Sequence, residues 1–301
     1  MNREEFIKLT EKRPLLLDGA MGSNLILAGM PRGVCSEQWI LEHPQVVEDL
    51  QRAYMEAGSQ VVYAPTFSAN RISMENMGLA DQVEHFNREI PKITRRAVGD
   101  QILVAGDMTT CGKLLEPGGT LSHEELFYAY AEQVRYLVEA GVDFIIGETL
   151  LYEAEALVLL DAAASVSDIA VCCSFTVEGD GTLPFGGNVV DAVENVEAMG
   201  AAAAGINCSM GPDQALAVVR NMKERLSIPV IAKLNAGMPE ISDQGQAVYS
   251  MDEKLFGTYM EKLLEAGASV VGGCCGTTPA YIAELNAVIE RFMKKYPQWT
   301  R

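Results

Sequence analysis

Three cysteines in the C-terminal third of the chain have the types and positions that a metal site needs. Cys274 and Cys275 are adjacent within Gly-Gly-Cys-Cys-Gly, and Cys208 follows a short apolar run. Neighbouring residues on a regular strand point to opposite faces, so both thiols face one ion only if the backbone bends, which flanking glycines permit. Three thiolates with an open fourth position are typical of catalytic zinc, and thiolates favour zinc over magnesium or calcium. We therefore predict one zinc ion on Cys208, Cys274 and Cys275.

The alternative for Cys274 and Cys275 is a pair of core thiols or a strained vicinal disulfide. The third cysteine at another strand end favours the metal. Cys172 and Cys173 lie inside an apolar run, where buried cysteine is usually inert. Neither the loop cysteines nor the histidines are predicted as ligands, because none follows a strand: Cys35, Cys111, His43, His85 and His123.

The pattern of apolar residues places these cysteines in a repeated α/β chain. Short β-rich runs are predicted as strands at 14–18, 60–64, 102–107, 143–148, 169–175, 203–207, 229–234 and 269–273. Amphipathic runs are predicted as helices at 44–57, 81–98, 123–140, 153–166, 189–199, 212–225, 251–266 and 279–294, with Pro44, Pro212 and Pro279 in first turns. An open doubly wound sheet shares this alternation. The count of eight and the absence of an evident second domain favour a single (β/α)₈ TIM barrel over residues 1–301.

Active sites of such barrels form at the C-terminal ends of the strands. Glu148 directly follows a strongly apolar run, so it should lie inside the barrel mouth, where a carboxylate suits a substrate ammonium. The alternative is a solvated or helix-capping side chain. Asp107 is a weaker candidate, because the following loop could redirect it. The polar residues predicted at strand ends, besides the cysteines, are Asp18, Thr66, Asp107, Glu148, Asn207 and Asn235.

Composition limits the classes of function. The chain has 301 residues, of which 49% are hydrophobic and 21% charged, and this is typical of a globular protein. A formal net charge of -18 disfavours nucleic acid and anionic membrane surfaces as partners. The N-terminus has no secretory signal, and no apolar stretch approaches the ~18 residues of a membrane span. We therefore expect a cytoplasmic protein whose cysteines are thiols or metal ligands.

Several segments resemble the homocysteine S-methyltransferase family, and the homocysteine-binding domain of cobalamin-dependent methionine synthase is the most similar member. The resemblance covers essentially the whole chain, and the Ile-Asn-Cys and Gly-Gly-Cys-Cys-Gly segments are its most specific parts. The matching segments are 17–22, 66–70, 147–149, 205–209, 235–237 and 272–279.

This resemblance implies a barrel with zinc on the three cysteines and a methyltransferase of class EC 2.1.1 that acts in methionine biosynthesis. The implied acceptor is the thiol of homocysteine, whose amino acid part would be held near Asp18 and Glu148. The implied substrate contacts also include Gly19, Met21, Thr66 and Ser68. Asn235 would occupy the fourth zinc position before the substrate arrives.

Two departures from the family pattern concern the side of the barrel that meets the methyl donor. The loop at 108–112 lacks the usual Gly-Pro-x-Gly, and Pro65 stands where Asn is usual. No histidine here fits the Asp-x-His-x-x-Gly signature of cobalamin-binding domains. We therefore expect cobalamin only on a partner, a methyl-corrinoid protein acting in trans. S-methylmethionine or betaine is the alternative donor, and a zinc hydrolase or a non-catalytic zinc-binding module is the alternative of another class.

Overall fold

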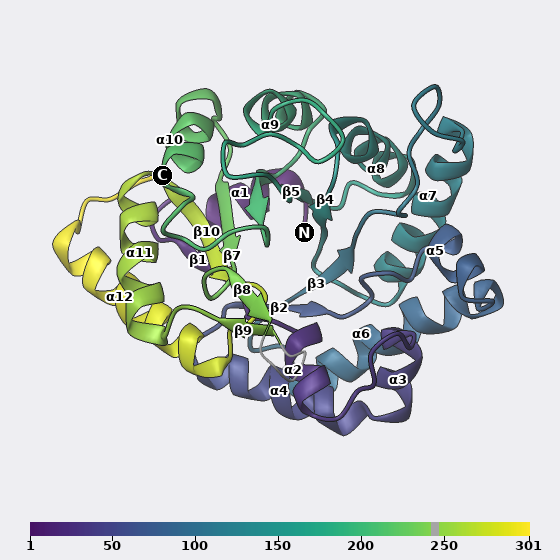
Figure 1. Cartoon of the computed structure of the whole chain (residues 1–301), viewed down its shortest axis with the longest axis horizontal. Helices are drawn as coiled ribbons and strands as arrows, with labels where there is room; N and C mark the ends of the chain where they lie inside the picture. The colour runs from purple at the N-terminus through teal and green to yellow at the C-terminus, as the bar shows by residue number, and fades with distance from the viewer. Residues whose placement is uncertain (242–246) are drawn as a thin grey trace.

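The computed structural model of the chain describes residues 1–241 and 247–301, and within them eight parallel strands form a nearly closed barrel. The strands surround the centre of the molecule and the helices form an outer ring (Figure 1). Their order around the sheet is β1-β10-β7-β6-β5-β4-β3-β2. The predicted TIM barrel is confirmed. The strands are β1 (Leu15–Leu16), β2 (Val61–Ala64), β3 (Leu103–Met108), β4 (Phe144–Leu150), β5 (Val171–Phe175), β6 (Ala203–Asn207), β7 (Val230–Leu234) and β10 (Ala268–Gly273).

Each strand is followed by at least one helix that packs on the outside of the barrel. Pro44 and Pro279 begin their helices, where a missing N–H leaves no hydrogen bond unmade. The main outer helices are α4 (Pro44–Glu56), α6 (Val83–Val98), α7 (His123–Glu139), α8 (Glu153–Val166), α9 (Val189–Ala198), α10 (Leu216–Arg225), α11 (Glu253–Glu265) and α12 (Pro279–Lys295).

The barrel closes between β1 and β2 through one backbone hydrogen bond and two that involve side chains. The backbone N–H of Gln60 donates to the carbonyl of Leu16 at 2.8 Å, and the Gln60 side chain accepts from the Leu16 N–H at 3.1 Å. Farther along, the Tyr63 N–H donates to Asp18 Oδ2 at 2.8 Å. An aspartate at the C-terminal end of β1 therefore takes the place of a backbone acceptor at this seam.

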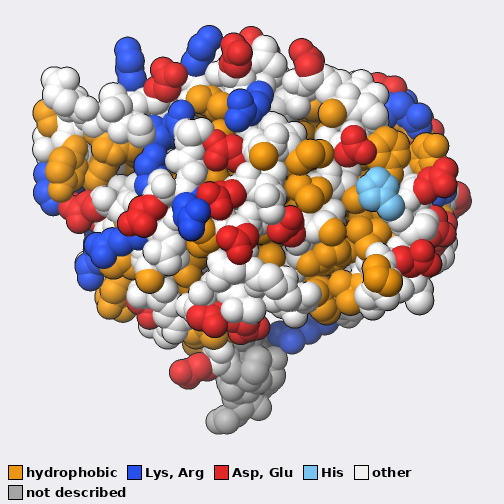
Figure 2. Space-filling view, turned by 90° about the horizontal axis from the view of Figure 1, so that it is seen from above, with side chains coloured by type: hydrophobic (Ala, Val, Ile, Leu, Met, Phe, Trp, Pro, Cys, Tyr) orange, Lys and Arg blue, Asp and Glu red, His pale blue; other side chains and the backbone are white. Residues whose placement is uncertain are grey.

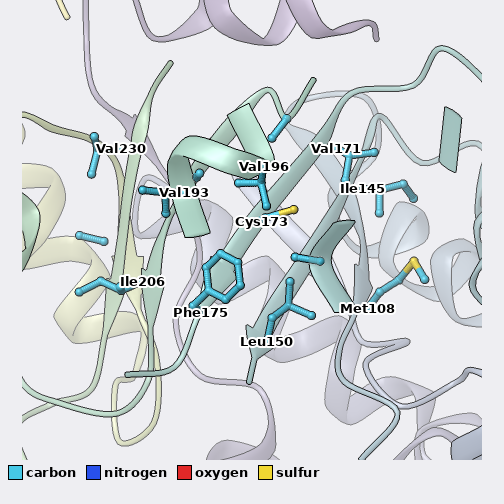
Figure 3. Packing of buried hydrophobic residues seen from close by; sticks show 14 of the residues in the cluster. Met108, Ile145, Leu150, Val171, Cys173, Phe175, Val193, Val196, Ile206 and Val230 are labelled. Atoms are coloured by element: carbon cyan, nitrogen blue, oxygen red, sulfur yellow. The ribbon is translucent and has the colours of Figure 1, made fainter. Parts of the chain in front are cut away.

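Alternation along the strands divides the core into two parts. One set of strand side chains fills the barrel interior together with Phe6. The Phe6 ring makes an edge-to-face contact with Phe144, which closes the N-terminal end of the barrel. The opposite set packs against the helices. Cys172 belongs to the interior and Cys173 to the outer layer, where its sulfur lies near Val196 (Figure 3). Both thiols are buried in the apolar core, which agrees with the prediction that they are not ligands.

The predicted boundaries fail where elements are short. β1 has two residues instead of five, although the backbones of Leu17 and Asp18 continue to hydrogen-bond to β10 beyond its end. Helix α10 begins at Leu216, and Pro212 lies in the preceding turn instead of in a first helical turn. The sequence analysis also missed several elements too short for an apolar period: α1 (Arg3–Leu9), α2 (Gly22–Leu27), α3 (Ser36–Glu42), α5 (Arg71–Asn76), η1 (Ala80–Gln82) and the hairpin β8 (Pro239–Ile241) with β9 (Ala247–Tyr249).

The surface carries charges of both signs despite the acidic total. Figure 2 shows acidic and basic side chains interspersed with apolar ones over one face. In the ranges 1–241 and 247–301, no helix is both long and apolar enough to cross a membrane.

Candidate functional site

A cavity of about 230 Å³ opens at the C-terminal ends of the strands. Strands β1, β2, β3, β4, β6, β7 and β10 all contribute to its wall directly or through the residue that follows them, and α2 and α3 add side chains at one side. Two chemically distinct regions share this space. One is a group of thiols, and the other is a group of buried charged residues. The residues with polar side chains that line the cavity are Asp18, Ser23, Ser36, Tyr63, Asp107, Glu148, Thr149, Cys208, Lys233, Cys274 and Cys275.

The thiol region brings the three predicted cysteines together. Cys208 Sγ lies 2.8 Å from Cys274 Sγ and 3.6 Å from Cys275 Sγ. All three sulfurs lie within 4.8 Å of one another, and within the described parts of the chain no other group of histidine, cysteine or acidic side chains converges in this way. Two of the three residues are half-buried and Cys274 is buried, so the cluster faces the cavity from its wall.

Unusual backbone conformations produce this convergence. Cys208 and Ser209 both have left-handed backbone, with φ of 56° and 57°, which is costly for residues other than glycine. The Cys208 N–H donates to the carbonyl of Lys233 on the neighbouring strand at 3.1 Å, and this bond fixes the bend. Gly276 has φ of 81°, and a Cβ there would lie 2.3 Å from the Tyr249 ring. Glycine at this position therefore lets the chain turn directly after Cys275 while the β8–β9 hairpin packs against it.

The sulfur positions fit a thiolate-bound metal. Zinc bound at about 2.3 Å in a tetrahedron separates its sulfurs by about 3.8 Å. The Cys208–Cys275 distance of 3.6 Å is close to that value, whereas the Cys208–Cys274 distance of 2.8 Å must open when a metal binds. Asn235 lies just beyond β7 with its Oδ1 buried and without a hydrogen-bond partner among the described residues. The residues on either side of Asn235 bond to the backbone of Cys274 and Cys275, so an unpartnered oxygen here is a candidate for a further ligand.

Hydrogen bonding makes the three thiols unequal. Bonds from Cys208 and Cys274 lower the pKa of Cys275 far below the ordinary thiol value. Donating to its neighbours raises the pKa of Cys208. One negative charge is therefore shared by the cluster at neutral pH, and a cation would be attracted to it.

The charged region surrounds Lys233, a residue that the sequence analysis did not select. Its Nζ lies 3.5 Å from Asp18 Oδ1, 4.0 Å from Glu148 Oε2 and 4.7 Å from the centre of the Tyr63 ring. Its side chain is 5% exposed. Burial alone would lower the pKa of Lys233, but the charges of Glu148 and Asp18 hold it above its usual value. The group is therefore an ammonium.

Asp107 adds a further carboxyl group to this region. β3 continues through Met108, so the following loop does not redirect Asp107, and its side chain lines the cavity. Burial, together with the charge of Glu148, raises the pKa of Asp107 well above its usual value. Burial also raises the pKa of Glu148 to about 7, although Lys233 opposes this shift. One lysine therefore faces three carboxyl groups whose protonation is linked.

Asn207 joins the two regions. Its Oδ1 accepts from the Thr149 N–H at 2.7 Å and from Ser174 Oγ at 2.8 Å, and its Nδ2 donates to Thr149 Oγ1 at 2.8 Å. Thr149 has φ of 57° and directly follows Glu148. Since Asn207 directly precedes Cys208, one buried amide fixes the backbone beside both an acid and a thiol.

The predicted substrate contacts divide into two groups. Asp18, Gly19, Met21 and Glu148 line the cavity, whereas Thr66, Ser68 and Asn235 do not. Thr66 is fully buried, and its hydroxyl donates to the backbone carbonyl of Asp107 at 2.8 Å. The Ser68 N–H donates to the carboxylate of Glu37, which ties the loop after β2 to α3. The residues from this loop that reach the cavity are Pro65 and Phe67.

The homocysteine S-methyltransferase family model matches residues 15–289. The chain belongs to the homocysteine S-methyltransferase family. The predicted resemblance is therefore confirmed at the level of the family. Among curated relatives, the methionine synthases of Mycobacterium tuberculosis and Mycobacterium leprae are 31% and 30% identical over 306 and 304 residues. Each match covers 95% of this chain and 25% of the relative, so the chain spans about a quarter of the length of these curated relatives.

Solved structures agree with the family at the level of the fold. The homocysteine methyltransferase MmuM from Escherichia coli superimposes in its oxidised form with a TM-score of 0.79 at 23% identity, covering 95% of this chain and 99% of MmuM. Its metallated form gives a TM-score of 0.76 at 24% identity, covering 93% and 98%. These likenesses show the fold that this member of the homocysteine S-methyltransferase family shares with MmuM. The thiol cluster is a candidate metal site on its own geometry.

Proposed function

We propose that this chain transfers a methyl group to the thiol of homocysteine, giving methionine, and that Cys208, Cys274 and Cys275 hold a zinc ion for this reaction. The convergence of three thiols from β6 and β10 beside a charged cavity carries the proposal. A metal there would supply the Lewis acid that keeps an acceptor thiol deprotonated at neutral pH. Three thiolates exceed the charge of a divalent ion, so the acceptor sulfur keeps electron density and remains nucleophilic.

The chain's own residues position the acceptor. The cysteines would fix the sulfur end of the acceptor through the metal, and Asp18, Glu148 and Lys233 line the same cavity with charged groups. The acceptor sulfur forms a bond to the methyl carbon while the bond from carbon to the donor breaks, and the donor keeps that electron pair. The thiol proton leaves for solvent when the acceptor binds.

We propose a methylated corrinoid protein acting in trans as the donor. A methyl group on cobalt is readily displaced by a thiolate, whereas a methyl group on a folate nitrogen has a poor leaving group. The departures at Pro65 and in the loop at 108–112 lie on the donor side of the barrel and leave the thiol cluster intact. S-methylmethionine and betaine are the competing donors.

The test is a donor screen with zinc-loaded protein and homocysteine. Methylcobalamin, S-methylmethionine, betaine and methyltetrahydrofolate are each supplied without other proteins, and methionine is measured. Slow turnover with methylcobalamin alone supports the corrinoid donor. Rapid turnover with S-methylmethionine or betaine would show that one of these compounds is the donor instead. If no donor, including a methylated corrinoid protein, gives methionine, the proposed function is wrong.

A second test concerns the bond from the acceptor sulfur to the metal. Homocysteine must lose a proton to bind there, so the binding enthalpy should change with the ionisation enthalpy of the buffer. Titration calorimetry in phosphate and in Tris measures the difference. Equal enthalpies in the two buffers would argue against direct coordination.

A further inference from the structure

Lys233 occupies a position in the barrel that lysine rarely takes. Along β7, Ile231 points into the barrel interior, whereas Val230, Ala232 and Leu234 pack against the helices. Lys233 is two residues after Ile231, so the same alternation turns its side chain inward at the layer that meets the cavity. Lysine is almost never fully buried unless it is paired. Its place in the cavity wall therefore indicates a role at the site.

The contacts of Lys233 leave part of its hydrogen-bonding capacity free. The distances to Asp18 Oδ1 and Glu148 Oε2, 3.5 and 4.0 Å, are too long for two strong hydrogen bonds. Both of these carboxylate oxygens are buried and lack a hydrogen-bond partner among the described residues. The ammonium is thus held mainly by charge, and its N–H groups remain available to a ligand carboxylate in the same cavity.

The same geometry disfavours a second ammonium at this point. A substrate amine that bonded both Asp18 Oδ1 and Glu148 Oε2 would lie beside Nζ, which is already 3.5 and 4.0 Å from those two oxygens. Like charges at such a distance repel strongly in a buried site. Asp107 Oδ1 is also unpartnered and lines the same cavity, so a weaker position for an amine remains there.

We propose that Lys233 determines the acceptor specificity of this site by binding the carboxylate of the thiol acceptor, while it fills the place between Asp18 and Glu148 that an acceptor ammonium would otherwise take. The acceptor class is a short thiol with a carboxylate at the end opposite its sulfur, and homocysteine is one member. This inference rests on the proposed transfer to a thiol. The Lys233 carbonyl accepts from the Cys208 N–H, so the residue that binds the carboxylate also fixes the backbone of a thiol.

The test compares three thiols by calorimetric titration of zinc-loaded protein. Homocysteine carries both charged groups, 4-sulfanylbutanoate lacks the amine, and 3-aminopropane-1-thiol lacks the carboxylate. We expect the first two to bind within about 3-fold of each other and the third to bind at least about 10-fold more weakly, since a charge-assisted hydrogen bond is lost. Lys233→Met should remove this preference and favour the aminothiol, whereas Lys233→Arg should retain it.

The outcomes separate this inference from the proposed function. If homocysteine binds and 3-aminopropane-1-thiol binds as well as 4-sulfanylbutanoate does, the role of Lys233 is wrong and the methyl transfer stands. If none of the three thiols binds, both fail. Lys233→Met leaves two carboxylates without their cation, so zinc content and thermal unfolding are measured to show that it folds. Should it not fold, the comparison of ligands on the unmodified protein still decides the question.

Discussion

The two regions of the cavity are built in opposite ways. The thiol region depends on the backbone: left-handed Cys208 and a glycine turn after Cys275 bring together side chains that regular strands would separate. The charged region is centred on a regular strand, β7, whose ordinary alternation places Lys233 between two acids, although one of them, Glu148, lies at an irregularity in β4. A site that requires bent backbone depends on its immediate neighbours, whereas one on regular strands depends on the balance of charge. Substitutions in the two regions should therefore have different consequences.

The largest expected effect is in the thiol region. Cys208→Ser should reduce the zinc content from about one ion per chain to near zero and methyl transfer to background, because two thiolates do not complete a zinc site. Metal analysis and an assay of methionine formation measure the two effects. Cys35→Ser is the matched control, since Cys35 is half-buried and lies outside the cluster. Full zinc in Cys208→Ser would refute the ligand assignment.

The next effect concerns the link between the regions. Asn207→Ala removes three hydrogen bonds, one buried and two part-buried, and leaves the left-handed backbone of Thr149 unsupported. We expect a loss of about 2–4 kcal/mol in the free energy of unfolding, because the freed groups remain at least partly shielded from water. Urea unfolding measures it, with Asn195→Ala as the control, because Asn195 makes an exposed hydrogen bond. Equal stability of the two variants would show that the regions are independent.

Glu148→Gln should affect only the charged region. It keeps the size of the side chain but removes a charge that holds Lys233 in place, so the affinity for homocysteine should fall about 10-fold, or about 1.4 kcal/mol. Zinc content should not change. Titration calorimetry and metal analysis measure the two, and Glu124→Gln on the exposed start of α7 is the control. A simultaneous loss of zinc would mean that the two regions form one unit.

The last effect is a dependence of stability on pH in the metal-free protein. Burial raises the pKa of Glu148 from 4.5 to about 7, so the folded protein holds this proton more tightly than the unfolded chain does. The resulting stabilisation is complete below about pH 4.5 and is lost as the pH rises through 7. It amounts to at most about 3 kcal/mol. Urea unfolding at about pH 5 and about pH 8 should show a smaller pH dependence in Glu148→Gln than in the unmodified protein, because the buried Asp107 still binds its proton more tightly when folded.

The contrast between the regions also explains what the sequence could predict. Cys208, Cys274 and Cys275 were found because cysteine is rare and because each follows a recognisable apolar strand. Lys233 was missed because it lies inside the run 229–234, which was interpreted only as a strand. The signal for a site residue was available: a lysine occupies an inward position of a parallel strand, and its neighbours on both sides are apolar. The partner of such a residue depends on strand order, which a single sequence does not give.

Similar reasons account for the other differences. The long helices and most strands follow apolar periods and were predicted to within a few residues. Short α2 and α3 lack a full period, yet they carry Met21, Ser36 and their neighbours to the cavity. Thr66 was selected for its position after β2, but a tight turn buries its hydroxyl against the backbone of β3. Local turns of this kind depend on tertiary contacts.

At the seam between β1 and β2, one hydrogen bond should respond to whether a ligand occupies the cavity. Asp18 uses one carboxylate oxygen to accept the Tyr63 amide at 2.8 Å, while its other oxygen faces Lys233. A ligand that engages Lys233 should therefore change how firmly Asp18 holds that amide. Hydrogen–deuterium exchange at Tyr63 should slow when an acceptor thiol binds and quicken in Asp18→Asn, without any change in the thiols. Through this one residue, events in the cavity are coupled to how often the barrel opens along its side.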